Sequence, residues 1–280
     1  MPAPRYRALV PILAFLFTVA PVSAKAQDPS WRPAAPWPAV TPRVSSVIEK
    51  LMADSKVKRA MEFLREDDAR AIREMIVLTE IPAPSFEEGP KAIEFLSLAL
   101  ASGLSDSRLD KTGNAIAMRR GRGNGDLFGV KGLVRDTPNI AAFIGFEPLP
   151  IGAISIQNTA SVRYEVRYSA PGGHSFAAFG EVPGGITPPD SPIIQASLAA
   201  IRATGNKELA MVGVSTNAGV PIAAGIPTVV LAPGGKMFGF HALSEAIDPT
   251  GTWQGAQTAL LTLLAIAGID GLPEPLAEKR

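Results

Sequence analysis

Apolar residues recur at helical spacing over the first third of the chain. Between Pro42 and Leu51 they fall at intervals of three and four residues, which predicts a helix with one buried face and a proline in its first turn. Residues 57–64 and 72–76 repeat this spacing and predict two more helices. A fourth apolar stripe follows Ser85 and Glu88, which form a capping-box pattern, and Gly103 is placed to end that helix. The residues expected to face inward in this fourth helix are Ala92, Phe95, Leu96 and Ala99.

The pattern then changes to extended segments. Residues 107–110 and 115–119 flank a turn and predict a β-hairpin, followed by a glycine-rich basic loop at 119–125 and a short helix around 127–133. Residues 140–146 are apolar throughout, which is typical of a buried central strand. Residues 162–168 alternate apolar and charged side chains, which predicts a strand with one solvent-exposed face in a different layer.

Helices and strands alternate in the last third of the chain. A helix over residues 193–201 is followed by apolar strands at Leu209–Val214 and Ile226–Leu231. A long final helix is expected to bury Ala256, Leu260, Leu264 and Ala267. This order indicates an α/β fold with a largely buried sheet. Because ligands bind beyond the strand ends of such sheets, the loops after Phe146, Val214 and Leu231 are expected to carry the site.

Composition and charge narrow the class of partner. The 280 residues are 46% hydrophobic and 19% charged, as in ordinary globular proteins, and glycine and proline are both frequent at 26 each. A formal charge of +1 provides no field for nucleic acid or an anionic membrane. A small-molecule partner is therefore expected.

The first residues resemble a secretory signal. Two arginines precede an apolar run at 8–20, and a small-residue cleavage pattern ends at Ala26, so residues 1–26 are predicted to be a signal peptide and 27–42 a proline-rich leader. The apolar run falls short of the roughly 20 residues needed to span a bilayer, so no membrane span is expected after cleavage. The protein is thus predicted to be exported, to the periplasm or the medium. It has no cysteine, which excludes thiol catalysis and cysteine-based zinc sites.

Two common chemistries find little support. Ser215 follows a strand, but its surroundings lack the second glycine of a nucleophile elbow, and no acid lies between it and His241. We interpret Ser215 as a strand-end hydroxyl. The loop Gly121–Gly125 has neither dinucleotide-fingerprint spacing nor a Walker lysine, and a flexible basic turn is the simpler interpretation.

Metal chemistry is the third candidate. Glu147 directly follows the strand ending at Phe146, and His241 ends a glycine-rich loop, with Glu245 and Asp248 just after it. A carboxylate and an imidazole are ligand types that suit zinc. The alternative is a surface histidine and helix-capping acids. His174, in a Gly-Gly-His-Ser turn, has the same two interpretations.

Four stretches, in order, resemble the aminoacylase, peptidase-T and glutamate-carboxypeptidase family of co-catalytic zinc hydrolases, most closely its peptidase-T-like members. They are Leu78–Glu88 with Asp110–Asn114, Gly125–Lys131, Phe146–Pro148 with Ala170–Ser175, and Gly225–Pro227 with His241–Glu245. The resemblance implies a zinc-exopeptidase-like three-layer sheet domain, formed by residues 43–158 and 186–280. Residues 159–185 would be a vestigial lid, or dimerisation, segment.

The same resemblance implies roles for three residues. Glu147 corresponds to the carboxylate ligand of one zinc ion and His241 to the imidazole ligand of the other. His174 corresponds to the lid histidine that contacts substrate, in some members across the interface of a homodimer. The family hydrolyses an amide next to a free carboxylate, so the expected substrate is a small peptide or an N-acyl amino acid.

Large departures from the family bear on activity. The His-x-Asp motif, the bridging aspartate and the Glu-Glu pair are absent, because Arg119–Asn124 runs directly into Gly125-Asp126, and the chain has only two histidines. A second gap falls near Val182–Ile186, and the family's substrate-carboxylate motif is altered at Ser215–Gly219. No general-base glutamate is found, so hydrolysis by this chain is expected to be lost or feeble.

Two other hypotheses stay open. One is a non-catalytic exported protein that binds small carboxylated ligands through His174 and the loop Ser215–Gly219. The other is a chain with two internal deletions that folds poorly and exposes unpaired strand edges.

Overall fold

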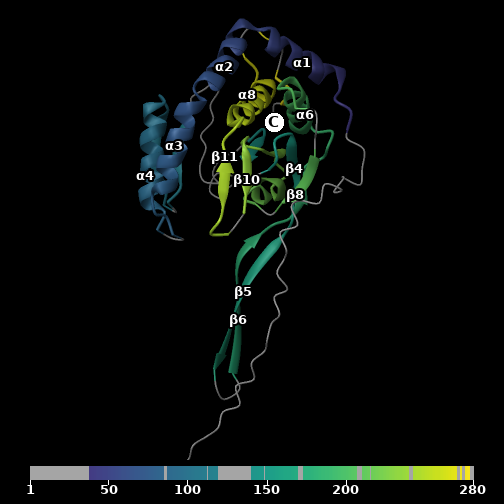
Figure 1. Cartoon of the computed structure of the whole chain (residues 1–280). Helices are drawn as coiled ribbons and strands as arrows, with labels where there is room; N and C mark the ends of the chain where they lie inside the picture. Colours follow the sequence, from purple (N-terminus) through teal and green to yellow (C-terminus); the bar gives the residue numbers. More distant parts are fainter. Residues whose placement is uncertain are drawn as a thin grey trace, which may run out of the picture. The chain divides into compact units, whose positions relative to one another are not determined.

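We analysed a computed structural model of the whole chain (Figure 1). It describes residues 38–84, 87–111, 113–118, 140–147, 149–169, 173–206, 210–214, 216–239, 242–269, 272 and 275–277. For the hairpin at 161–182 only the backbone is described. All these residues belong to one compact unit that extends from Ala35 to Arg280. The predicted signal peptide, the basic loop at 119–125 and the helix around 127–133 lie outside the described residues.

Two amphipathic helices, α1 (Pro42–Ala53) and α2 (Ser55–Glu66), begin the described chain. The Thr41 side chain accepts a hydrogen bond from the Val44 N–H, and the Asp54 carboxylate accepts from the N–H groups of Lys56 and Val57. These caps satisfy donors that a helix start leaves unpaired. The hydrogen bond from the Val57 N–H is the main reason that the pKa of Asp54 is lowered. The predicted inward faces are confirmed at the residues Val44, Val47, Ile48, Leu51, Val57 and Met61.

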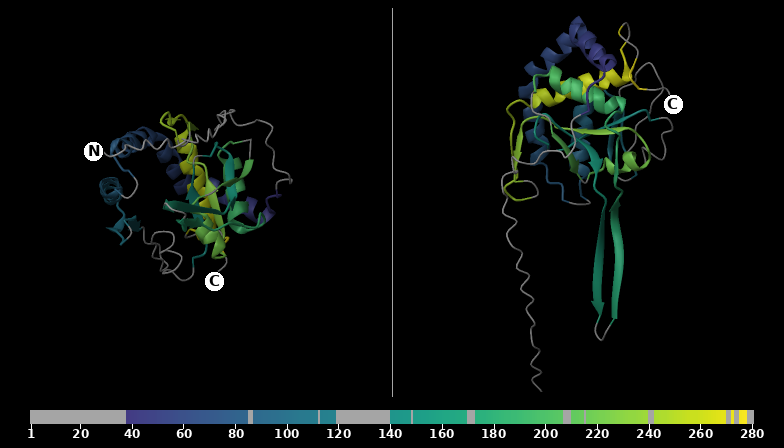
Figure 2. Two further views of the ribbon diagram at one scale, coloured as in Figure 1. Left: turned by 90° about the horizontal axis from the view of Figure 1, so that it is seen from below. Right: turned by 90° about the vertical axis from the view of Figure 1, so that its right-hand side faces the viewer.

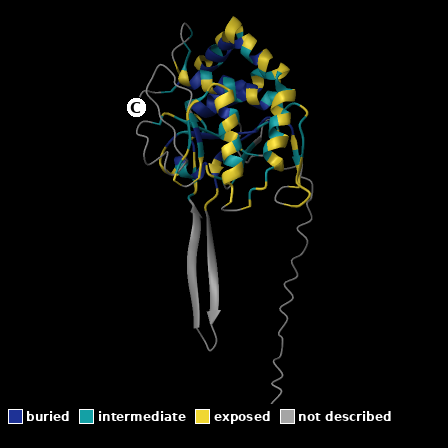
Figure 3. Ribbon diagram, turned by 90° about the vertical axis from the view of Figure 1, so that its left-hand side faces the viewer, coloured by how far each residue is buried: buried dark blue, intermediate teal, exposed yellow. Residues whose placement is uncertain are grey.

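Helices α3 (Asp68–Glu80) and α4 (Gly89–Ala101) bury much less. Figure 3 views the side that carries them, and much of both is coloured exposed. No residue of α3 is buried, and Ile76 is 49% exposed. In α4 Ala99 is buried as predicted, but Phe95 is 49% exposed, so its inward assignment is wrong. A helical stripe predicts one common face, and it does not show whether a partner covers that face.

The start of α4 also differs from the prediction. Its N-cap is Glu88, without a side-chain hydrogen bond, three residues after the predicted Ser85, which lies outside the described residues. The helix ends at Ala101 before Gly103, whose φ of 77° fits its predicted terminating role. The hairpin is confirmed as antiparallel β1 (Ser105–Leu109) and β2 (Ala115–Met118).

A five-stranded mixed sheet forms the centre of the fold. Its strands are β3 (Phe143–Phe146), β4 (Ala153–Asn158), β7 (Gly185–Ile186), β8 (Ala210–Val214) and β9 (Thr228–Leu231). The order is β3-β9-β4-β7, and β8 pairs with β4. β3 is parallel to β9 and β8 is parallel to β4, whereas β4 is antiparallel to β9. The α/β class is therefore confirmed.

The central strand of this sheet is not the one predicted. In the described part of the chain β3 pairs only with β9, so it lies at the edge, and Phe146 is 52% exposed. The centre is formed by β9, which was predicted as a strand, and β4, which was not. The run from Ala153 to Ile156 is buried throughout, but Ser155 interrupts its hydrophobicity. An apolar run indicates burial but not a position within a sheet.

Two helices, α6 (Pro192–Ala203) and α8 (Thr252–Ala267), lie side by side over the sheet (Figure 2). With α1 they form the core against Ile154, Ile156, Val229 and Leu231. Nine consecutive residues of α6, Ile193–Ile201, are buried, which includes the predicted face. Burying one leucine such as Leu198 stabilises the fold by about 1.5–3 kcal/mol.

The predicted buried face of α8 is correct only in part: Leu260 and Leu264 are partly buried against the core, but the two alanines are not buried. Ala256 and Ala267 are exposed, and the buried residues are Gly255, Gln257, Thr258, Leu261, Thr262, Ala265 and Ile266. The polar members bury because they are hydrogen-bonded. The Thr258 and Thr262 hydroxyls donate to carbonyls four residues earlier, and Gln257 Nε2 donates to the Met61 carbonyl at 2.6 Å. Satisfied hydroxyls and amides can occupy a core at little cost, and hydrophobicity alone does not identify them.

Two further hairpins and a short helix complete the structure. β5 (Ser161–Ser169) and β6 (Gly173–Val182) form a separate two-stranded sheet, and β10 (Lys236–Phe238) pairs with β11 (Ala246–Asp248). Helix α7 spans Gly219–Ala223. Strand β5 confirms the strand and the separate sheet predicted from the alternation at 162–168. No helix among the described residues is long and apolar enough to cross a membrane.

Close packing at Gly255 generates a stability prediction. A Cβ added there would lie 2.2 Å from both the carbonyl carbon and the oxygen of Pro233, whereas one at Gly89 would meet nothing within 4 Å. We predict that Gly255→Ala lowers the free energy of unfolding by about 1–3 kcal/mol through overpacking. Gly89→Ala, the control, should raise it by less than about 1 kcal/mol. Urea unfolding of both variants measures this, and equal effects would contradict the packing.

Candidate functional site

Glu147 lies where two parallel strands end together. β3 and β9 are paired in register up to Phe146 and Leu231, and the Glu147 N–H donates to the Leu231 carbonyl at 3.2 Å. The residue is half-buried. The structure therefore brings the predicted carboxylate ligand beside the loop that leads from β9 toward His241.

That loop runs through the β10–β11 hairpin. Its tip contains Gly239, with a φ of 63°, and the predicted ligand His241 is outside the described residues. Glu245, near the end of the tip, is exposed. The Asp248 carboxylate accepts the Thr250 N–H at 3.0 Å, and bonds from Thr250 lower the pKa of Asp248. Asp248 thus stabilises the turn before α8, but it does not cap the helix, because the N-cap Gly251 has no side-chain cap hydrogen bond.

His174 lies near the tip of the β5–β6 hairpin. It is paired with Tyr168, one pair from the end of the ladder at Ser169 and Gly173, whereas the root pair is Ser161 with Val182. The backbone register thus places His174 at the opposite end of the hairpin from its root, about 25 Å away for strands of this length.

Asn158 holds the root of that hairpin. It is 3% exposed, and its Nδ2 donates to the Pro183 carbonyl at 2.8 Å while its Oδ1 accepts the Thr216 N–H at 2.8 Å. Gly219 packs so closely that an added Cβ would lie 2.3 Å from the Pro183 carbonyl oxygen. One buried amide therefore joins β4, the chain leaving β6 and the loop after β8.

The loop at 216–219 has local roles for its polar groups. Besides the bond from its N–H to Asn158, Thr216 accepts the Ala218 N–H on its hydroxyl at 3.0 Å, which forms a turn before α7. Ser215, once weighed as a nucleophile, lies outside the described residues. The loop is thus built as a structural connection to the hairpin root.

The three loops predicted to share one edge are separated. Here an edge means a side of the sheet at which strands start or finish. Strands β3 and β9 finish at one such edge, with Phe146 and Leu231, and β4 starts there because Ile154 pairs antiparallel with Leu231. Since β8 runs parallel to β4, Val214 pairs with Asn158 at the other edge. The expectation for the loop after Val214 is therefore wrong, because it assumed strands of one direction.

The described donors at the Glu147 edge do not by themselves complete a zinc site. Zinc sites need three or four protein ligands. Among the described residues no group of three or more histidine, aspartate or glutamate side chains is placed to hold a metal ion. One carboxylate, with the imidazole predicted at His241, is too small a donor set to fit zinc.

The sequence analysis did not identify Asn158 as a buried structural residue. The signal available was its place after the short run Ala153–Ile156 and before the alternating strand. A polar residue between two strands is more often read as a turn, and only the tertiary contacts reveal that it is buried.

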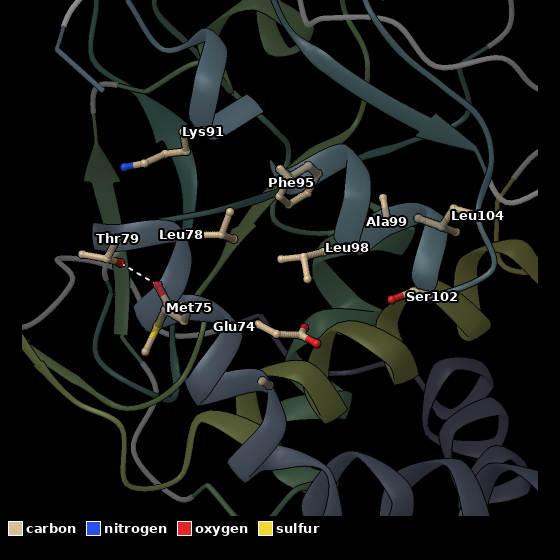
Figure 4. A pocket seen from close by; sticks show the side chains of 11 residues that line it. Glu74, Met75, Leu78, Thr79, Lys91, Phe95, Leu98, Ala99, Ser102 and Leu104 are labelled. Carbon is tan, nitrogen blue, oxygen red and sulfur yellow. Dashed lines mark hydrogen bonds between the residues drawn. The ribbon is translucent and has the colours of Figure 1, made fainter. Parts of the chain in front are cut away.

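A hollow of about 520 Å³ lies between α3 and α4 (Figure 4). Leu78 of α3 and Leu98 of α4 line it, with Phe95 on the same helix as Leu98. Thr79 donates its hydroxyl to the Met75 carbonyl at 2.7 Å. The lining of this hollow is mainly apolar, and it contains no residue of the predicted metal or substrate site.

Comparison with protein families and curated proteins adds no relative: no family model matches the sequence, and no curated protein matches it significantly. The family resemblance described above therefore stays a prediction.

The Asn158 contacts generate a second prediction. Asn158→Ala should lower the free energy of unfolding by about 2–4 kcal/mol, because it leaves the Pro183 carbonyl and the Thr216 N–H without their partner. The control Asn217→Ala changes an exposed amide in the same loop and should stay within about 0.5 kcal/mol. Thermal and urea unfolding provide both values. A stable Asn158→Ala protein would show that the root does not depend on this amide.

Proposed function

We propose that this protein is an exported, shortened relative of the co-catalytic zinc exopeptidases and that it does not hydrolyse peptides or N-acyl amino acids at an appreciable rate. The motif order across the chain supports the relationship. The observation that carries the proposal is the position of Glu147, hydrogen-bonded through its N–H to Leu231 where β3 and β9 end. One carboxylate follows the paired strands there, and no group of three or more possible metal ligands is found among the described residues.

The loss of activity follows from the missing groups. With two histidines in the chain, one predicted on the hairpin, a single imidazole is left for metal binding. One protein ligand for each ion cannot hold zinc tightly. The family's general base is also absent, and such a base contributes roughly 10²–10⁴ to the rate.

The binding-protein alternative expects one small ligand to contact both His174 and the loop Ser215–Gly219. The register puts His174 near the hairpin tip, about 25 Å from the root that the described part of this loop contacts, so such a ligand would reach only one of them. The described part of that loop lies at the Val214 edge of the sheet, away from Glu147. A carboxylated ligand held there would not reach the Glu147 edge, so binding and the remnant metal edge would be independent.

Metal analysis combined with an activity assay tests the proposal. We expect the purified chain, dialysed against a zinc buffer, to retain well below one zinc ion per molecule. We also expect no turnover of dipeptides or N-acyl amino acids above the level of its Glu147→Ala variant. Glu49→Ala changes an exposed carboxylate on α1 and serves as the control. Stoichiometric zinc, with turnover that Glu147→Ala abolishes and Glu49→Ala leaves intact, would contradict the proposal.

A further inference from the structure

A second cavity, of about 460 Å³, lies between two parts of the chain distant in sequence. Helices α2 and α3 form one wall, and the β10–β11 hairpin with the first turns of α8 forms the other. Its apolar lining includes Leu64, Ile72, Met75, Met237, Ile247 and Trp253. This volume lies within the range of small-molecule sites in proteins, about 300–1,000 Å³, and such sites are also lined mainly by apolar side chains.

Polar groups at the cavity are paired with one another. Arg70 forms ion pairs with Asp67 and Glu74, and its Nε donates to Asp67 Oδ1 at 2.8 Å. The bond from Arg70 lowers the pKa of Asp67, so that pair stays charged and mutually neutralised. The Thr252 hydroxyl donates to the Asp68 carboxylate at 2.5 Å. Asp68 also lies in the first turn of α3, where the helix dipole favours a negative charge.

Side-chain bonds hold the two walls together. The bond between Thr252 and Asp68 joins α8 to α3, and the bond from Gln257 to the Met61 carbonyl joins α8 to α2. Gly255 packs directly on Pro233, which itself lines the cavity. The cavity is therefore a preformed gap between braced elements.

We propose that this cavity binds a small, uncharged, apolar molecule. The aromatic ring, thioethers and aliphatic side chains provide the contact surface, and the paired polar groups leave no cation to receive an anionic ligand. An anion would face two carboxylates and only one guanidinium, itself already paired. This inference does not depend on the proposed function, because the cavity uses neither Glu147 nor either histidine.

Two dyes with the same ring system test the charge preference. N-phenyl-1-naphthylamine is neutral, and 8-anilinonaphthalene-1-sulfonate adds one negative charge. We expect the purified chain to bind one neutral dye per molecule, at least about tenfold more tightly than the sulfonate. Equal or tighter binding of the sulfonate, or binding at many weak sites, would overturn the proposal.

Substitutions on α8 locate the site. Ala256 lines the cavity and is exposed, so Ala256→Phe fills the cavity from a permissive position, while Ala267→Phe adds the same ring to an exposed position outside it. We expect Ala256→Phe to weaken binding of the neutral dye at least about tenfold and Ala267→Phe to leave it within about twofold. Circular dichroism checks that each variant is folded.

Two more variants make the result decisive. Met237→Gln places an amide in the apolar wall at nearly constant side-chain size and should weaken binding of the neutral dye several-fold. This variant tests the site if Ala256→Phe does not fold. Thr79→Phe fills the hollow between α3 and α4 and should not affect binding. Loss of binding in Thr79→Phe, with Ala256→Phe and Met237→Gln unchanged, would assign the dye to that hollow and refute the proposal.

Discussion

Strand β4 pairs with β8 in the same direction and with β9 in the opposite direction, and the rest of the sheet follows from this choice. Its inward residues Ile154 and Ile156 join the core beneath α6 and α8. Its last residue, Asn158, closes the sheet at the root of the β5–β6 hairpin. Reversing one strand also decides which loops meet, because the carboxyl ends of β3 and β9 share an edge with the start of β4.

This geometry limits the chemistry available to the chain. Both predicted metal ligands belong to loops that follow β3 and β9 at one edge, whereas the loop after β8, predicted to contact the substrate carboxylate, lies at the other edge. Glu147 and the approach to His241 stand at one edge, and the 216–219 loop stands at the other. Among the described residues, the first edge carries the Glu147 carboxylate, and the polar groups of the second edge form structural hydrogen bonds.

Much of the fold could be predicted where one face of an element packs against the core. The stripe around Leu51 and the apolar face around Leu198 are predicted correctly because their hydrophobic residues pack into the core, although Gln195 and Ser197 are buried beside them through hydrogen bonds. The order of the strands could not be predicted from hydrophobicity, since the edge strand β3 is more apolar than the central strand β4. Burial of Gln257 and the role of Asn158 depend on partners far along the chain. The position of Glu147 after a strand could be predicted from the sequence. The direction of β8 relative to β9 could not.

The division of the site between two edges can be measured directly because the chain has no cysteine to interfere with labelling. Spin labels on Pro150→Cys and Asn217→Cys would lie at the two ends of the paired strands β4 and β8, both on exposed residues. Double electron–electron resonance (DEER) should give a distance of about 20 Å or more between the two labels, because strands of this length rise by about that distance. A separation below about 12 Å would place both loops at one edge and contradict the account.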